Sequence, residues 1–123
     1  MALQDYDGRL YIDGHKLEID NGYSDNTLEV SYAEDCQLVG IRVFSESGFV
    51  YGDYATVTAH HPIDDSELSR FGNNCYLPTG NPVVEVFTQG DGAEIPSGIK
   101  IKVRLDAIDT NGRKAIIWLM LKK

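Results

Sequence analysis

The side chains best suited to chemistry lie in one short run, His60-His61-Pro62-Ile63-Asp64-Asp65. Imidazoles and carboxylates are the ligand types that zinc and similar ions use in proteins. Adjacent residues on a strand point to opposite faces of the sheet, so the two histidines cannot share one ion unless the chain bends between them. We therefore expect an ordinary strand end here, with one histidine buried and one exposed, and we expect no metal and no cofactor.

Other catalytic signatures are absent from the sequence. The chain has three histidines and two cysteines, and it contains no Gly-x-Ser-x-Gly elbow, Cys-x-x-Cys pair or nucleotide-binding glycine loop. We expect no catalytic residues and a protein that is not an enzyme, with a small β-barrel enzyme as the third-ranked alternative. Cys36 and Cys75 are expected to be buried, reduced thiols rather than a disulfide, because nothing at the start of the chain directs it to an oxidising compartment.

Aromatic side chains offer a second kind of site. Tyrosines near loops form the stacking platform of many sugar-binding sites, and the chain has seven tyrosines. In small β proteins tyrosines also cap the core, so both explanations stay open. The candidate glycan-binding residues are Tyr23, Tyr51, Tyr54 and Tyr76.

The charge of the chain argues against nucleic acid and anionic membranes as partners. Eleven Lys and Arg against nineteen Asp and Glu give a net charge of −8, which repels phosphate groups. The distribution is uneven, because residues 99–123 hold seven of the eleven basic side chains and two of the nineteen acidic ones. Such a basic strip is either the solvated face of an edge strand or a surface that docks on the acidic body of another copy.

The elements that position these residues are predicted to be short strands and turns. Apolar residues alternate with polar ones or form β-branched runs, and Gly, Asn, Asp and Pro interrupt them. About eight such runs in 123 residues predict an all-β fold. We expect one antiparallel β-sandwich, jelly-roll-like, forming a single domain over residues 1–123.

Three local patterns give more specific predictions. Asp13-Gly14 predicts a tight hairpin turn between strands at 10–12 and 16–19. Residues 63–71 predict one short helix in a crossover loop, because acidic residues stand where a helix N-terminus favours them. Residues 89–98 are predicted to form a long loop.

The last two strands are predicted to form a hairpin around Asn111-Gly112. The final strand has two apolar faces, so one face needs cover from a second sheet or from another subunit. With a two-residue turn, Arg104 lies opposite Leu119 and Lys102 opposite Leu121 on the outer face. Aliphatic side chains left exposed forgo about 1.5 to 3 kcal/mol each relative to full burial, which is enough to drive association. The candidate interface residues are Lys100, Lys102, Arg104, Ile117, Leu119 and Leu121.

Four short motifs in the second half of the chain form a pattern. They are Tyr51-Gly52-Asp53-Tyr54, the strand end His60-His61-Pro62, the Arg70-Phe71-Gly72 loop, and Ala93-Glu94-Ile95-Pro96-Ser97-Gly98 before a final pair of strands. Together, over about residues 50–123, they resemble small structural proteins of tailed bacteriophages. The resemblance implies a β-sandwich used in the virion, and it carries over no functional residues.

The leading hypothesis is an assembly protein. We expect a virion component, such as a capsid decoration or accessory protein, that is assembled in the host cytoplasm and binds itself, with a trimer favoured, and other virion proteins. Residues 1–7 lack the pattern of a signal peptide, and no apolar stretch is long enough to span a membrane, so we expect neither secretion nor membrane insertion. The alternative is a carbohydrate-binding, lectin-like module, with host-surface attachment as its role.

Overall fold

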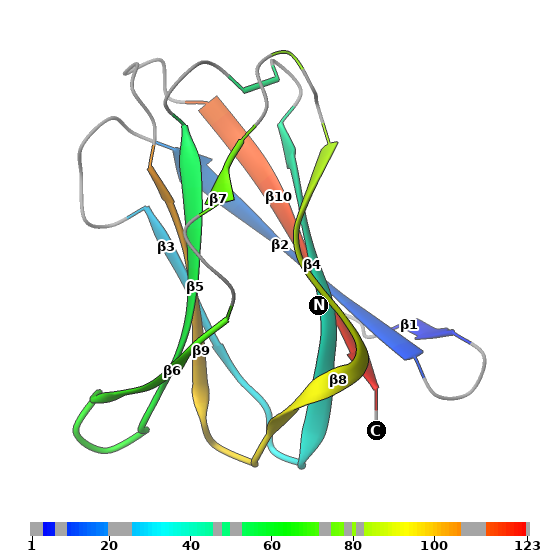
Figure 1. The fold of residues 1–123 in the computed structure, drawn as a ribbon, viewed down its shortest axis with the longest axis vertical. Helices are drawn as coiled ribbons and strands as arrows, with labels where there is room; N and C mark the ends of the chain where they lie inside the picture. Colours follow the sequence, from blue (N-terminus) through cyan, green and yellow to red (C-terminus); the bar gives the residue numbers. More distant parts are fainter. Residues whose placement is uncertain are drawn as a thin grey trace.

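The fold is all-β and has two antiparallel sheets, as the sequence predicts (Figure 1). The computed structural model describes residues 4–6, 10–19, 26–45, 48–49, 53–71, 75–77, 80, 83–106 and 113–122. Within these ranges, all the regular secondary structure consists of β-strands. It follows that, in the described ranges, no helix is present that is long and apolar enough to cross a membrane.

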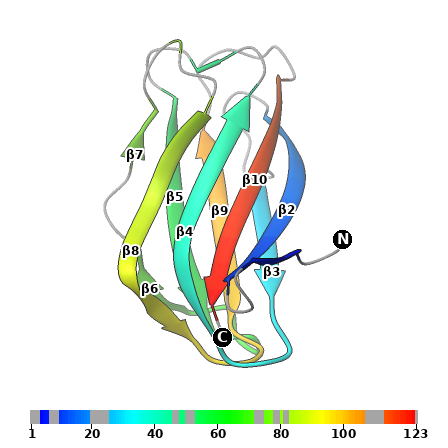
Figure 2. The ribbon, with the colours of Figure 1, turned by 90° about the vertical axis from the view of Figure 1, so that its right-hand side faces the viewer.

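Long strands that follow one another in the sequence alternate between the two sheets, so they lie in opposite layers (Figure 2). The first sheet has the order β1 (Gln4–Tyr6), β2 (Leu10–Ile19), β10 (Arg113–Lys122), β4 (Cys36–Ser45), β8 (Val83–Ile95). The second sheet has the order β3 (Thr27–Ser31), β9 (Lys100–Asp106), β5 (Tyr54–His60), β6 (Glu67–Arg70), with the short β7 (Cys75–Tyr76) paired to β5.

The core lies between the sheets and is built from alternate residues of the central strands. On β9 the inward side chains are Ile101, Val103 and Leu105, which are at most 1% exposed. On β10 they are Ile117, Leu119 and Leu121, at most 3% exposed. These two rows belong to one apolar cluster, and its burial is the main favourable term in folding a sandwich of this kind.

The predicted C-terminal hairpin is therefore wrong, although both of its strands exist. β9 pairs with β3 and β5, whereas β10 pairs with β2 and β4 in the other sheet. The apolar rows of the two strands meet across the core instead of lying side by side in one sheet. Ile117, Leu119 and Leu121 are consequently core residues and not the outward-facing contacts that the hairpin model predicted.

The predicted turn at Asp13-Gly14 is also wrong, because β2 runs straight through it as a ten-residue strand. Asp13 is buried, and its carboxylate accepts a hydrogen bond from the hydroxyl of Tyr32 at 2.8 Å. Gly14 lies under the ring of Trp118, and a Cβ at this position would come within 3.1 Å of Trp118 Cδ1. The two residues that signal a turn locally are therefore used for tertiary contacts.

Residues 63–71 form a turn and the strand β6, not the predicted helix. Asp65 has a φ of 61°, in the left-handed region, which ends any right-handed helical turn there. The Asp64 carboxylate accepts hydrogen bonds from the backbone N–H and the hydroxyl of Ser66, at 3.0 and 2.8 Å. This Asx-type turn, closed by the bond from His61 N to Ser66 O, joins β5 to β6 as a hairpin.

The predicted loop at 89–98 begins later than expected. β8 continues to Ile95, although its pairing with β4 jumps from Gly40↔Thr88 to Leu38↔Ala93. The residues between Thr88 and Ala93 form an irregularity rather than a separate loop, and the strand bends there (Figure 1).

Candidate interaction surfaces

The outer face of the first sheet is apolar at its centre. Alternation along β10 turns Ile116, Trp118 and Met120 outward, where each is partly exposed. Outward side chains of β2 and β4 surround them, and Phe44 packs against Trp118 with a ring-centroid distance of 6.1 Å. We call this surface the Trp118 face; its residues are Ile12, Val39, Phe44, Ile116, Trp118 and Met120.

The Trp118 face contains an open pocket of about 250 Å³, lined by Ile12, Arg42, Trp118 and Met120. Gly14 makes the pocket possible, since the absence of a side chain there lets the indole lie across β2. Trp118 pairs with Gly14 on one side and with Arg42 on the other.

Charged side chains surround the Trp118 face. Lys16 lies beside Ile116 on β2, and Lys114 and Lys122 stand near the two ends of β10. Arg42 lies beside Trp118 and is 3.6 Å from Glu85, measured from Nε to Oε1. Among the described side chains of this outer face, four cations (Lys16, Arg42, Lys114, Lys122) accompany two carboxylates (Glu85, Glu94), on a chain whose net charge is −8.

The outer face of the second sheet carries the β9 part of the predicted basic strip, which is Lys100, Lys102 and Arg104. Lys102 Nζ lies 2.7 Å from Asp65 Oδ2, Lys100 Nζ lies 3.2 Å from Glu29 Oε1, and Arg104 Nη2 lies 3.1 Å from Asp106 Oδ1. Each of these three cations is thus paired with a carboxylate of its own chain. We call this surface the β9 face. The pairing weakens the interpretation that these three cations attract the acidic body of another copy.

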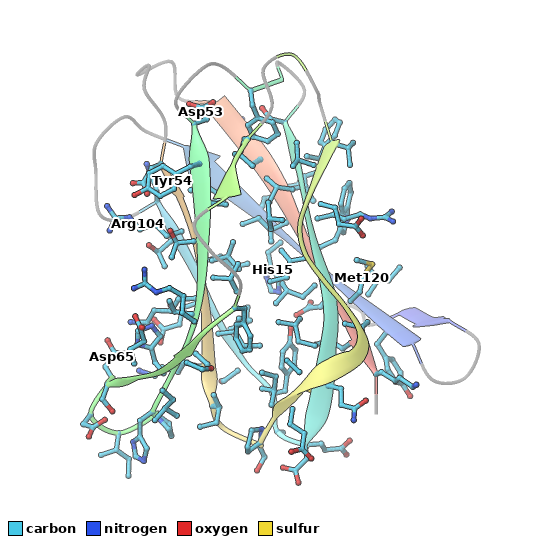
Figure 3. The ribbon with its side chains drawn as sticks, viewed as in Figure 1. His15, Asp53, Tyr54, Asp65, Arg104 and Met120 are labelled. Carbon is cyan, nitrogen blue, oxygen red and sulfur yellow. The ribbon has the colours of Figure 1, made fainter. Side chains whose placement is uncertain are left out.

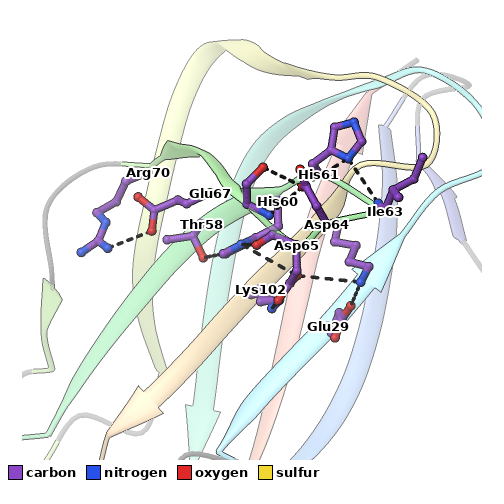
Figure 4. Close-up of polar contacts among 12 residues, drawn as sticks. Glu29, Thr58, His60, His61, Ile63, Asp64, Asp65, Glu67, Arg70 and Lys102 are labelled. Atoms are coloured by element: carbon purple, nitrogen blue, oxygen red, sulfur yellow. Dashed lines mark hydrogen bonds and ion pairs between the residues drawn. The ribbon is translucent and has the colours of Figure 1, made fainter.

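The loop between β5 and β6 folds against the β9 face (Figure 4). His60 Nδ1 lies 3.0 Å from the Asp65 carbonyl oxygen and therefore donates to it, since a carbonyl only accepts. The other ring nitrogen, His60 Nε2, is hydrogen-bonded to the Thr58 hydroxyl at 2.7 Å. His61 Nδ1 accepts from the backbone N–H of Ile63 at 3.2 Å. We call residues 61–66 the hairpin tip.

Two carboxylates of the hairpin tip are held in the ionised form. The hydrogen bond from Lys102, with the charges of Lys102 and Lys100, lowers the pKa of Asp65 below its usual value. The hydrogen bonds from Ser66 lower the pKa of Asp64. Both groups are exposed to solvent, so the two aspartates stay charged on a surface well below neutral pH.

The histidine pair does not form a metal site in the described structure. His60 is mostly buried and His61 is 42% exposed, which fits the expected strand end. Within the ranges the structure describes, no group of three or more His, Cys, Asp or Glu residues is placed to hold an ion.

A third polar cluster lies between the sheets at their β2–β3 edge. Asp13 Oδ2 accepts from Tyr32 and from His15 Nε2, each at 2.8 Å, and Figure 3 shows His15 between the two layers. Burial, followed by the hydrogen bond to Asp13, raises the pKa of Tyr32 well above its usual value of 10.0. Tyr32 is thus a neutral donor that joins the two sheets. Sequence reasoning missed this cluster, because Tyr32 lies 19 residues from Asp13 in the chain and on the other sheet's side of the core.

The predicted glycan-binding tyrosines are not brought together by the described side chains. Tyr54 points outward on β5, next to Asp106 of β9. Tyr76 is described only through its backbone pairing with Tyr54, and Tyr23 and Tyr51 lie outside the described residues. The glycan platform stays a prediction.

Cys36 is buried and forms no disulfide, while the side chain of Cys75 is outside the description.

The fold and its surfaces define a two-layered antiparallel β-sandwich with one apolar outer face. It is similar to a structure of infectious bursal disease virus Gt strain, with a TM-score of 0.50 and 13% identity, over 93% of this chain and 32% of that one. A crystal structure of the VP2 subviral particle of that virus gives 0.46 and 13%, over 93% and 32%. A nora virus structure gives 0.46 and 12%, over 99% and 61%.

At these identities the likeness shows the fold alone, and it rests on the structure whose TM-score reaches 0.50. The chain spans about a third of the length of that viral chain. No protein-family model and no curated protein matches the sequence.

Proposed function

We propose that this protein is a non-enzymatic structural component of a virus particle, which works by binding copies of itself and other particle proteins. The observation that carries the proposal is the Trp118 face. Large apolar side chains on the outer face of a sheet gain free energy when a partner removes them from water. A contiguous surface of this kind on a folded protein is a feature of interaction sites.

The likeness in fold to a structure of infectious bursal disease virus supports placing the protein in a particle. The motifs that resemble small structural proteins of tailed bacteriophages support a phage particle, and within it a decoration or accessory role. We also propose a jelly roll. Its support is the strand order, since β2-β10-β4-β8 in one sheet and β3-β9-β5-β6 in the other are two runs of four strands connected by repeated crossings between layers.

The proposed mechanism assigns different roles to the two outer faces. Burial of Trp118 and its apolar neighbours supplies affinity, and the cations around them orient an acidic partner. The proposed role of Lys100 and Lys102 on β9 is to hold the hairpin tip through Asp65, rather than to contact a partner directly.

Sedimentation of the purified protein over a range of concentrations tests the proposal. We expect a closed oligomer, with a trimer favoured, and we expect Ile116→Glu to shift it toward monomer. Thr27→Glu is the matched control, because it places the same charge on an outward strand position of the second sheet, beside Arg104. A wild-type protein that stays monomeric throughout, or equal effects of the two substitutions, would contradict the proposal.

A further inference from the structure

The hairpin tip presents an apolar side chain to solvent. Ile63 is 89% exposed, the highest value among the large apolar side chains that the structure describes as exposed. A single exposed isoleucine is ordinary on a protein surface. Ile63 differs from such a residue because hydrogen bonds hold the turn that carries it.

The backbone around Ile63 is fixed on both sides. Its own N–H donates to His61 Nδ1, and Asp65 N donates to the His61 carbonyl oxygen at 3.0 Å. Asp65 then ties the tip to β9 through Lys102. A side chain presented by a preorganised turn loses little further backbone entropy on binding, which favours its use as an anchor.

The pocket on the Trp118 face has the dimensions and chemistry to receive such an anchor. Its volume of about 250 Å³ is below the roughly 300 to 1,000 Å³ of the pockets that bind drug-sized ligands. Ile12, Trp118 and Met120 give it apolar walls. An aliphatic side chain from a protein surface fits this description better than a small molecule does.

The anchor and the pocket lie on opposite sides of the molecule. The tip folds over the outer face of the second sheet, and Met120 lies on the outer face of the first, as the labels of Asp65 and Met120 show in Figure 3. The whole sandwich separates them. The anchor of one copy therefore has access only to the pocket of a different copy.

The charges at the two places are complementary. Asp64 adjoins Ile63 and its side chain is 67% exposed, and its lowered pKa keeps it ionised. Arg42 lines the pocket, its side chain is 52% exposed, and its Nε lies 3.6 Å from Glu85 Oε1. Lys16 adds a second cation on the same face. Opposite charge at matching positions favours encounter and fixes orientation.

We infer that Ile63 of one copy inserts into the Ile12–Arg42–Trp118–Met120 pocket of a second copy, with Asp64 directed toward Arg42. The inference rests on the proposed function and names its contact. Because the two surfaces differ, the contact is head-to-tail, and its repetition closes a ring if the rotation allows and otherwise extends a filament. A symmetric trimer is one such ring.

Two substitutions separate the halves of this contact. Ile63→Ser removes the anchor from an exposed turn and leaves the pocket intact. Met120→Glu places a carboxylate in the pocket and leaves the anchor intact. We expect each to weaken self-association about ten-fold or more, measured by sedimentation equilibrium at low salt. Leu68→Ser, which truncates another exposed apolar side chain, on β6 of the second sheet and outside both the hairpin tip and the pocket, is the matched control and should change nothing.

Mixing the two variants gives the decisive result. The Ile63→Ser copy retains a working pocket and the Met120→Glu copy retains a working anchor, so a one-to-one mixture should form a heterodimer and grow no further. A mixture that stays monomeric, or single variants that still assemble like wild type, would overturn the inference. If Ile116→Glu dissociates the oligomer while Ile63→Ser does not, the proposed function stands and this contact is wrong. A monomeric wild type would overturn both.

Discussion

The two outer faces of the sandwich differ in the side chains that their central strands turn toward solvent. On the Trp118 face, the central strand presents Ile116, Trp118 and Met120 to solvent. On the β9 face, the equivalent positions of the central strand are Lys100, Lys102 and Arg104, and each is paired within the chain. The inner faces of β10 and β9 are alike, since both are aliphatic and buried.

This difference shows where binding free energy remains available. Exposed ion pairs contribute about 0 to 1 kcal/mol and are already made on the β9 face, so a partner gains little by replacing them. Apolar area on the Trp118 face yields about 25 cal/mol per Å² when it is covered. The face whose central strand is apolar therefore offers a partner more binding free energy, although the basic residues of β9 are the more obvious feature of the sequence.

The largest expected effect separates the two sides of β10. Leu119→Asp places a carboxylate in the core at a position that is 0% exposed, and we expect destabilisation by more than about 4 kcal/mol or loss of the fold. Met120→Glu, one residue along and facing outward, should change the free energy of unfolding of the monomer by about 1 kcal/mol or less. Urea unfolding checks both. Similar losses for the two variants would mean that the faces of β10 are assigned wrongly.

A smaller effect is expected from the glycine beneath the indole. Gly14→Val puts a branched side chain where a Cβ already comes within 3.1 Å of Trp118 Cδ1, so the ring must move. We expect a loss of about 1 to 3 kcal/mol from overpacking. The chain has one tryptophan, so a red shift of its fluorescence emission reports the displacement directly. Lys16→Val, on the same strand and the same face, is the control and should leave the emission unchanged.

The sequence predicted the fold class because apolar and polar residues alternate along most strands. It failed at Asp13-Gly14, where the turn signal is local but its explanation is not. Asp13 accepts a hydrogen bond from Tyr32, nineteen positions away in the chain. Gly14 leaves room for the ring of Trp118, which lies on a strand that only the fold brings alongside. Such contacts leave no periodic trace in a single sequence.

The apolar outer face of the last strand was predicted in part. The two apolar faces of the last strand indicated that one face would need cover from a second sheet or from another subunit, and the second sheet covers the face of Leu119. The prediction chose the wrong face as outward because it paired β10 with β9. On a strand, side chains alternate with a period of two, so the error in the pairing partner placed Leu119 and Leu121 outward, whereas the structure has Trp118 and Met120 there.

The smallest expected effect tests whether the β9 face satisfies its own charges. The pKa of Asp65 is lowered in the folded protein by Lys102, from a usual value of 3.8. A group of this kind stabilises the fold above its unfolded pKa, and the contribution is lost as the pH falls through the lower folded value. Asp65→Asn should therefore lower the urea midpoint slightly at pH 7, and the difference from wild type should shrink as the pH falls below about 4 toward the lower folded pKa.

Glu94→Gln is the control for charge alone, because it also removes one exposed carboxylate but lies on β8 in the other sheet. A double variant with Lys102→Met then isolates the pair, since removing Asp65 should matter less once its partner is gone. If Asp65→Asn has the same effect at pH 3 and pH 7, the contact with Lys102 does not hold the tip in solution. In that case the cations of β9 are available to a partner, and the contrast between the two faces is one of apolar against basic binding surfaces.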